Sequence, residues 1–80
     1  MRLDLYLKKT RLIKRRTIAC EMAKNERIFK NGLPLKPSYE VKIGDEIEIR
    51  FGNRIMKISV KDNSDRKPEF EVISELSLGM

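Results

Sequence analysis

The fold is decided by residues 2–19, which read RLDLYLKKTRLIKRRTIA and contain two short helical patterns. In the first pattern, Leu3 and Leu7 lie four residues apart and Tyr6 falls on the same helical face. Asp4 in the first turn and two lysines in the last turn suit the helix dipole. These features predict a first helix over residues 3–9.

A second helix is predicted to begin at residue 14 or 15 and to end at residue 24. Its apolar residues recur every four positions, as Ile18 with Met22 and Ala19 with Ala23. The alanines suit close packing on the first helix, and the segment between the helices should turn Leu12 and Ile13 inward. We interpret Cys20 as a small helix residue without a chemical role.

The start of the second helix breaks a local rule, because Lys14, Arg15 and Arg16 lie at the positive end of its dipole. Cations cost about 0.3–1 kcal/mol each at that end, whereas the free backbone N–H groups there favour phosphate. We interpret the three cations as a phosphate-binding cluster formed at the expense of helix stability. The alternative is a solvated basic run, which is common in lysine-rich proteins.

Short strands and turns are expected in the rest of the chain. Residues 27–30 predict a strand, with Asn25 able to adopt a left-handed conformation before it. Asn31-Gly32 predicts a turn that brings Lys30 and Lys36 round beside the helices. Alternating apolar residues predict strands at 46–51 and 54–60, joined by Gly52-Asn53 as a type II′ turn. After a loop at 61–69, a last strand is expected at 70–73, and residues 74–80 should fray.

The two halves of the chain differ in charge. Residues 1–36 carry eleven Lys or Arg against three Asp or Glu, a net +8, whereas residues 37–80 carry seven against nine, a net −2. A polyanion is therefore the first class of partner to consider, and it should meet the N-terminal half.

The composition disfavours several other classes of protein. Eighty residues make one domain, and no apolar run approaches the roughly 18 residues of a membrane helix. The N-terminus does not resemble a signal peptide, which favours a cytoplasmic location. The chain has no histidine, a single cysteine and no phosphate-binding glycine motif. We therefore expect no enzymatic activity, no cofactor and no metal.

Asp45, Glu46 and Glu48 are the clustered carboxylates that could suggest a metal or catalytic site. Glu46 and Glu48 share one face of a predicted strand, but no histidine or third ligand accompanies them. We interpret the cluster as the solvated face of that strand.

Several short motifs together resemble the ribosomal protein S-four type RNA-binding domain, also called the alpha-L motif. The motifs are RLD at 2–4, R-x-x-x-R-R-x-x-A at 11–19, NG at 31–32, KPS at 36–38 and V-x-x-G-D-x-I at 41–47. The resemblance covers residues 2–51. It implies an α+β fold, in which two N-terminal helices pack on a small, curved, mainly antiparallel sheet and bind RNA with the adjoining loop.

A stand-alone copy with RLD at residue 2 and RLIKRRT at 11–17 resembles the RqcP group, which is related to the fifteen-kilodalton heat-shock protein. Members of this group bind large ribosomal subunits that retain a peptidyl-tRNA, contact rRNA and tRNA, and assist RqcH in adding alanine tails. The resemblance implies the same partners here, and we expect a monomer without membrane contact. Two alternatives stay open: a general structured-RNA or tRNA binder, and an RNA-binding accessory subunit of a separate enzyme.

Charge and resemblance together indicate a set of RNA-binding residues, with Arg2, Asp4 and Arg16 as the principal ones. The full set is Arg2, Asp4, Lys8, Arg11, Lys14, Arg15, Arg16, Lys30 and Lys36. Asp4 has two compatible interpretations. It can cap the first helix and pair with a cation such as Arg15 or Arg16, and it can orient arginine side chains toward RNA.

The chain departs from the family pattern at two positions. Glu26 stands where the family usually has glycine, so Asn25 is expected to make the turn instead. Lys30 stands where an apolar residue is expected, so the strand is shifted there or Lys30 extends its ammonium to the surface.

Overall fold

Two helices, α1 (Leu3–Lys9) and α2 (Arg16–Lys24), confirm the helices predicted from the spacing of apolar residues. The structure is a computed structural model and describes residues 1–77. Helix α2 begins at Arg16, because the residue before it has an extended backbone and acts as the N-cap. Within residues 1–77, neither helix is long and apolar enough to cross a membrane.

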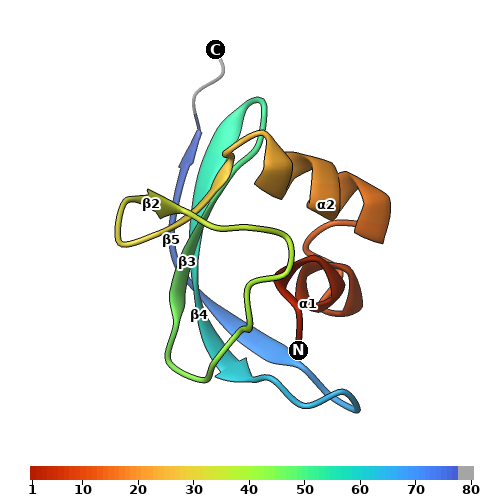
Figure 1. Cartoon of the computed structure of the whole chain (residues 1–80). Coiled ribbons are helices and arrows are strands. Elements are labelled where there is room, and N and C mark those ends of the chain that lie inside the picture. The colour runs from red at the N-terminus through yellow and green to blue at the C-terminus, as the bar shows by residue number, and fades with distance from the viewer. Residues whose placement is uncertain (78–80) are drawn as a thin grey trace.

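Five antiparallel strands form one curved sheet, whose order is β2-β1-β3-β4-β5. The strands are β1 (Ile28–Lys30), β2 (Leu33–Pro34), β3 (Glu46–Arg50), β4 (Arg54–Asp62) and β5 (Glu69–Ser77). Figure 1 shows both helices on one side of the sheet, with the short β1–β2 hairpin at the opposite side of the molecule. The predicted fold class, two N-terminal helices on a small curved antiparallel sheet, is thus confirmed.

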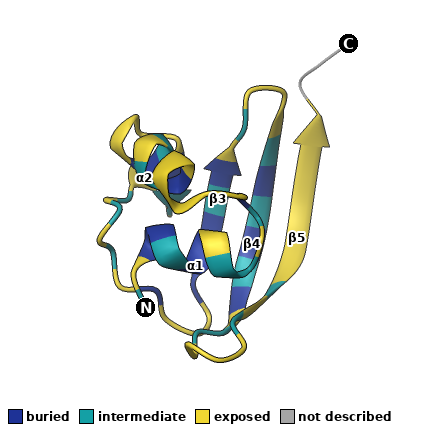
Figure 2. Ribbon diagram, turned by 90° about the vertical axis from the view of Figure 1, so that its right-hand side faces the viewer, coloured by how far each residue is buried: buried dark blue, intermediate teal, exposed yellow. Residues whose placement is uncertain are grey.

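The core lies between the helices and the inner face of the sheet. Leu3, Tyr6 and Leu7 of α1 are fully buried, as predicted from their spacing. They meet buried residues of the sheet and its connections, which include Ile28, Val41, Ile47, Ile49, Met56, Ile58 and Val60. Figure 2 shows this burial along β3 and β4, whereas β5 is exposed along nearly its whole length.

Helix α2 buries a narrower face than the sequence predicted. Ala19 and Ala23 are buried and Met22 packs against the core, but Ile18 is 47 % exposed. Successive residues of a helix turn by about 100°, so a helix that buries Ala19 and Ala23 turns Ile18 toward its flank. Ile18 therefore does not belong to the core.

The C-terminal hairpin is longer than predicted. Strand β4 continues to Asp62, and β5 runs over nine residues to Ser77, pairing Leu76 with Ile55. The prediction that the chain frays from residue 74 was therefore wrong for 74–77, while residues 78–80 lie outside the described part. Gly52 and Asn53 do connect β3 to β4, but Gly52 lacks the positive φ that a type II′ turn needs.

Helix α2 ends in a way that the sequence did not predict. Asn25 has φ −88°, whereas Glu26 has φ 57° and takes the left-handed position. The Glu26 amide donates to the Ala23 carbonyl (3.1 Å) and the Arg27 amide to the Met22 carbonyl (3.0 Å). These bonds form a Schellman motif, whose left-handed residue is the one that follows the C-cap. The expectation that Asn25 would make this turn was therefore wrong.

We predict opposite effects of glycine at these two neighbouring positions. Glu26→Gly should raise the free energy of unfolding by about 0.5–1 kcal/mol, because a left-handed backbone costs energy for glutamate and none for glycine. The larger conformational entropy of glycine in the unfolded chain offsets only part of this stabilisation. Asn25→Gly should lower it, because φ is ordinary there. Urea denaturation of both variants tests this, and a stabilising effect of Asn25→Gly alone would contradict it.

Candidate nucleic-acid interface

The carboxylate of Asp4 joins the starts of the two helices. Asp4 is only 3 % exposed, although it belongs to the first turn of α1. Arg2 donates to both of its oxygens, from Nε at 3.3 Å and from Nη2 at 3.2 Å, and the Leu5 amide donates at 2.8 Å. The Nε of Arg16, the first residue of α2, lies 3.5 Å from Oδ1. The predicted pairing of Asp4 with Arg16 is thus confirmed, and Arg2 is a second partner.

This arrangement leaves the two arginines available to a ligand. Their side chains are 49 % and 46 % exposed, while the side chain of Asp4 between them is 4 % exposed. Arg16 approaches Asp4 with its Nε, and no side-chain hydrogen bond from Arg16 to another group is formed within residues 1–77. A planar guanidinium that is fixed along one edge presents the other edge in a defined direction, which suits phosphate or base recognition.

Acidic partners neutralise most cations of the long strands. Four ion pairs lie on β3, β4 and β5 or between them: Arg50–Glu48, Arg54–Glu75, Lys57–Glu46 and Lys61–Glu71. By contrast, the segment from α1 to the start of α2 carries four cations that form no ion pair within residues 1–77. They are Lys8, Arg11, Lys14 and Arg15. The charge asymmetry of the sequence therefore becomes an unpaired positive face at the helices.

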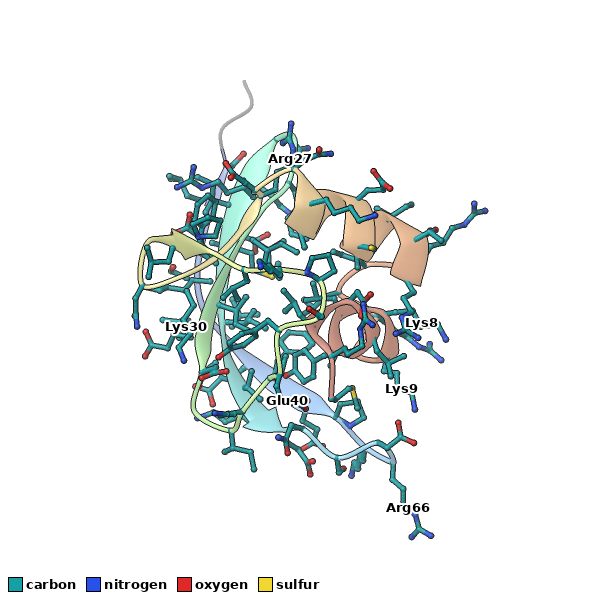
Figure 3. The ribbon with its side chains drawn as sticks, in the orientation of Figure 1. Lys8, Lys9, Arg27, Lys30, Glu40 and Arg66 are labelled. Carbon is teal, nitrogen blue, oxygen red and sulfur yellow. The ribbon has the colours of Figure 1, made fainter. Side chains whose placement is uncertain are left out.

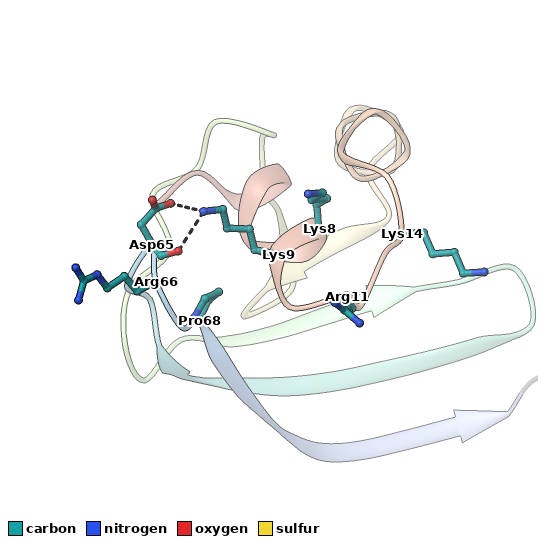
Figure 4. Close-up of a pocket in the computed structure, with 7 residues that line it drawn as sticks. All are labelled: Lys8, Lys9, Arg11, Lys14, Asp65, Arg66 and Pro68. Carbon is teal, nitrogen blue, oxygen red and sulfur yellow. Dashed lines mark hydrogen bonds and ion pairs between the residues drawn. The ribbon is translucent and has the colours of Figure 1, made fainter.

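A cleft of about 580 Å³ opens at the C-terminal end of α1. Lys8, Lys9, Arg11 and Lys14 line one side, and the loop between β4 and β5 contributes Arg66 among others (Figure 4). Lys9 and Arg66 were not among the predicted site residues. Lys9 directly follows the predicted Lys8 in α1. No local sequence signal marks Arg66, because its loop reaches α1 only through the path of the sheet.

The other predicted residues do not all join this face. Lys36 is exposed and lies near Ala23 and Lys24 of α2, so the turn at Asn31-Gly32 does bring it beside the helices. Lys30 lies far from the labelled Lys8 and Lys9 (Figure 3). The prediction that the turn brings Lys30 beside the helices was therefore wrong.

Lys30 belongs instead to a polar cluster at the β1 side of the sheet. Its ammonium donates to Asp45 Oδ1 at 2.8 Å and to the Tyr39 hydroxyl at 3.1 Å, and Tyr39 donates to Asp45 Oδ2 at 2.7 Å. Asp45 is 7 % exposed, so its assignment to a solvated strand face was wrong. Lys30 ends β1, and its side chain is partly exposed while its ammonium donates to a buried carboxylate fifteen residues later.

The pKa values of this cluster follow from its geometry. Burial alone would raise the pKa of Asp45, but hydrogen bonds from Lys30, Tyr39 and the Lys42 amide outweigh it and hold that pKa below its usual value. Hydrogen bonding to Asp45 is the main reason that the pKa of Lys30 is raised. Burial, followed by the hydrogen bond to Asp45, raises the pKa of Tyr39. The cluster is thus built to hold Asp45 ionised.

Two short helices on an open antiparallel sheet define a small α+β domain, and within residues 1–77 unpaired cations gather at its helices. Residues 1–47 match the S4 domain. The chain belongs to the S4 domain family, as the motifs of its first half indicated.

Two bacterial proteins of nearly the same length are similar to this chain in sequence. Over 81 residues the chain is 46 % identical to the RQC P-site tRNA stabilizing factor of Streptococcus pneumoniae, and the match covers 94 % of this chain and 92 % of that protein. It is 44 % identical to the Bacillus subtilis protein of the same name, over 99 % of both chains. The fold is similar to that of heat shock protein 15 from Vibrio cholerae, whose structure was described as trimeric. That comparison gives a TM-score of 0.82 at 28 % identity and covers 92 % of this chain and 82 % of the other.

Asp45→Asn should destabilise the domain by about 1–3 kcal/mol at pH 7, because it removes the charged acceptor of Lys30 and Tyr39. The folded-state pKa of Asp45 lies below the unfolded value, so its contribution is complete above about pH 4 and is lost as the pH falls through the folded pKa. Urea denaturation should therefore show the gap between wild type and variant narrowing below pH 4. Glu48→Gln, which breaks a surface pair with Arg50, should cost less than about 1 kcal/mol. A gap that widens in acid would contradict this assignment.

Proposed function

We propose that this chain is a non-catalytic RNA-binding factor of ribosome-associated quality control. In this proposal it binds rRNA and tRNA on large ribosomal subunits that carry peptidyl-tRNA, and it assists an RqcH-type factor in alanine tailing. The observation that carries the proposal is the unpaired positive face at the two helices, because it gives a polyanion one side of the molecule to bind. The names of the bacterial relatives support the choice of tRNA at the P site.

The arrangement suits an RNA clamp better than an enzyme. Arg2 and Arg16 supply guanidinium groups that Asp4 holds in place, and they can read phosphate or base edges with a fixed orientation. Arg15 precedes Arg16, and Arg11 and Lys14 line the cleft at the other end of α1; these cations add attraction that depends little on RNA sequence. A factor of this kind acts by stabilising a bound RNA, so it needs no nucleophile, metal or cofactor. We propose that it works in the cytoplasm as a monomer.

The small size of the domain also fits binding between larger partners. Its extents are 38 × 23 × 23 Å, and its neutralised strands lie across the core from the helices (Figure 1). One side can thus bind RNA while the paired charges of the sheet avoid strong repulsion from, or attraction to, neighbouring RNA. A general structured-RNA binder would use the same positive face, so the choice between the two functions depends on the RNA preferred.

Co-sedimentation separates these functions. The purified chain should pellet with large subunits that carry peptidyl-tRNA, and less with empty large subunits, intact ribosomes or free tRNA. With about four to six phosphate contacts, log affinity should fall against log salt with a slope of roughly −3 to −5. Equal binding to all structured RNAs would favour the general binder, and a flat salt response would contradict the electrostatic basis of both.

Substitution of Asp4 tests whether orientation matters beyond charge. Asp4→Asn removes a negative charge beside the RNA site, so attraction alone predicts tighter binding. Our proposal predicts weaker binding, by about 3–30-fold, since Arg2 and Arg16 lose their charged anchor. Glu21→Gln on the exposed surface of α2 makes the same charge change and should leave binding unchanged or slightly tighter. If the two folded variants bound RNA with equal affinity, the orienting role of Asp4 would be contradicted.

A further inference from the structure

The loop between β4 and β5, residues 63–68, and the first residue of β5 are held against α1 by two side chains of that helix. Lys9 Nζ donates to the Asp65 side chain at 2.6 Å and to the Asp65 backbone carbonyl at 3.1 Å (Figure 4). One helical turn earlier, the hydroxyl of Tyr6 donates to the carbonyl of Glu69 at 2.6 Å. The loop therefore has a defined place beside the C-terminal end of α1, although it is separated from α1 by more than fifty residues.

Hydrogen bonds inside and below the loop keep its shape. The Ser64 amide donates to Asp62 at 2.7 Å, and the Lys67 amide donates to the Ser64 hydroxyl at 3.2 Å. Asn63 donates to the carbonyl of Val41 at 3.0 Å, which attaches the base of the loop to the segment between β2 and β3. A side chain carried by this loop thus has a fixed point of attachment.

Arg66 is the unpaired cation of this loop at the rim of the cleft, within the described residues. Seven Lys or Arg lie between residues 37 and 77, and five of them pair with a carboxylate. Within the described residues, Lys42 and Arg66 form no such pair, and Arg66 is the one that lines the cleft with Lys8, Arg11 and Lys14. Figure 4 shows its side chain extending outward from the rim of the cleft.

We propose that the β4–β5 loop is a second arm of the RNA-binding face, in which Arg66 contacts backbone phosphates and the Lys9–Asp65 pair positions the loop. The inference rests on the proposed function and extends its site from the helices to the far hairpin. An RNA strand that passes over the cleft would meet Lys8, Arg11 and Lys14 on one side and Arg66 on the other. The β4–β5 loop thus extends the proposed RNA-binding surface beyond the starts of the two helices.

The placement of Asp65 supports a positioning role for the pair. A carboxylate at the edge of a phosphate site repels RNA, so a purely attractive surface would lack it. Here Lys9 pairs with that charge, and the hydrogen bond from Lys9 lowers the pKa of Asp65. Lys9 is accordingly a positioning residue, while Arg66 is the group that meets the ligand.

The test uses large ribosomal subunits carrying peptidyl-tRNA as the probe and compares Arg66→Ala with Lys42→Ala. Both variants remove one unpaired cation from the same half of the chain, but Lys42 lies outside the cleft. Arg66→Ala should weaken binding about 3–10-fold and reduce the magnitude of the salt slope by about 1. Lys42→Ala should change binding less than about twofold, as expected for a distant screened charge. Thermal unfolding should be unchanged in both.

A second background tests the positioning pair. In Asp65→Asn protein, whose loop has lost its ion pair, Arg66→Ala should weaken binding less than twofold. Equal effects of Arg66→Ala and Lys42→Ala would overturn the second arm and leave the proposed function standing. An Arg66 effect that is the same in both backgrounds would overturn the positioning role of the pair. Failure of the wild-type chain to bind these subunits would overturn the proposed function and this inference with it.

Discussion

The structure depends on one buried carboxylate, that of Asp4, placed where two helices begin. A buried charge is tolerated only when it is paired and hydrogen-bonded, and Asp4 meets this need with Arg2, Arg16 and a backbone amide. The first turn of α2 contains no acidic residue. The negative charge that offsets cations at the positive end of its dipole therefore comes from α1. This explains how the chain keeps a basic helix start without losing the helix.

Much of the fold could be predicted because it depends on local spacing. The four-residue interval of Leu3 and Leu7 determined α1, and the alternation around Ile47 and Ile49 determined β3. Errors arose where a distant partner decides the outcome. Ser74 to Ser77 form a strand only because the first half of β4 offers an edge to pair with. Glu26 is left-handed because the Schellman hydrogen bonds fix the geometry there, whichever residue occupies the position.

The site could be predicted only in its contiguous part. Lys14, Arg15 and Arg16 stand together in the sequence, and their place at the start of α2 is confirmed, while their binding of RNA stays a prediction. Lys30 was misplaced because Asp45, which binds its ammonium, lies in another part of the chain. Arg66 was missed for the corresponding reason, since a loop far along the chain reaches α1 through Lys9 and Asp65. Charge pairing across the sheet, which no single segment reveals, decides which cations stay free.

Lysine footprinting tests most directly the claim that RNA binds the face of unpaired cations. The chain should be acetylated at limiting reagent, alone and bound to large subunits carrying peptidyl-tRNA, and each lysine should be quantified by mass spectrometry. We expect Lys8 and Lys14 to become protected on binding, whereas Lys57 and Lys61, paired with carboxylates on the sheet, should keep their reactivity. Protection of Lys57 and Lys61 with Lys8 and Lys14 still reactive would contradict it.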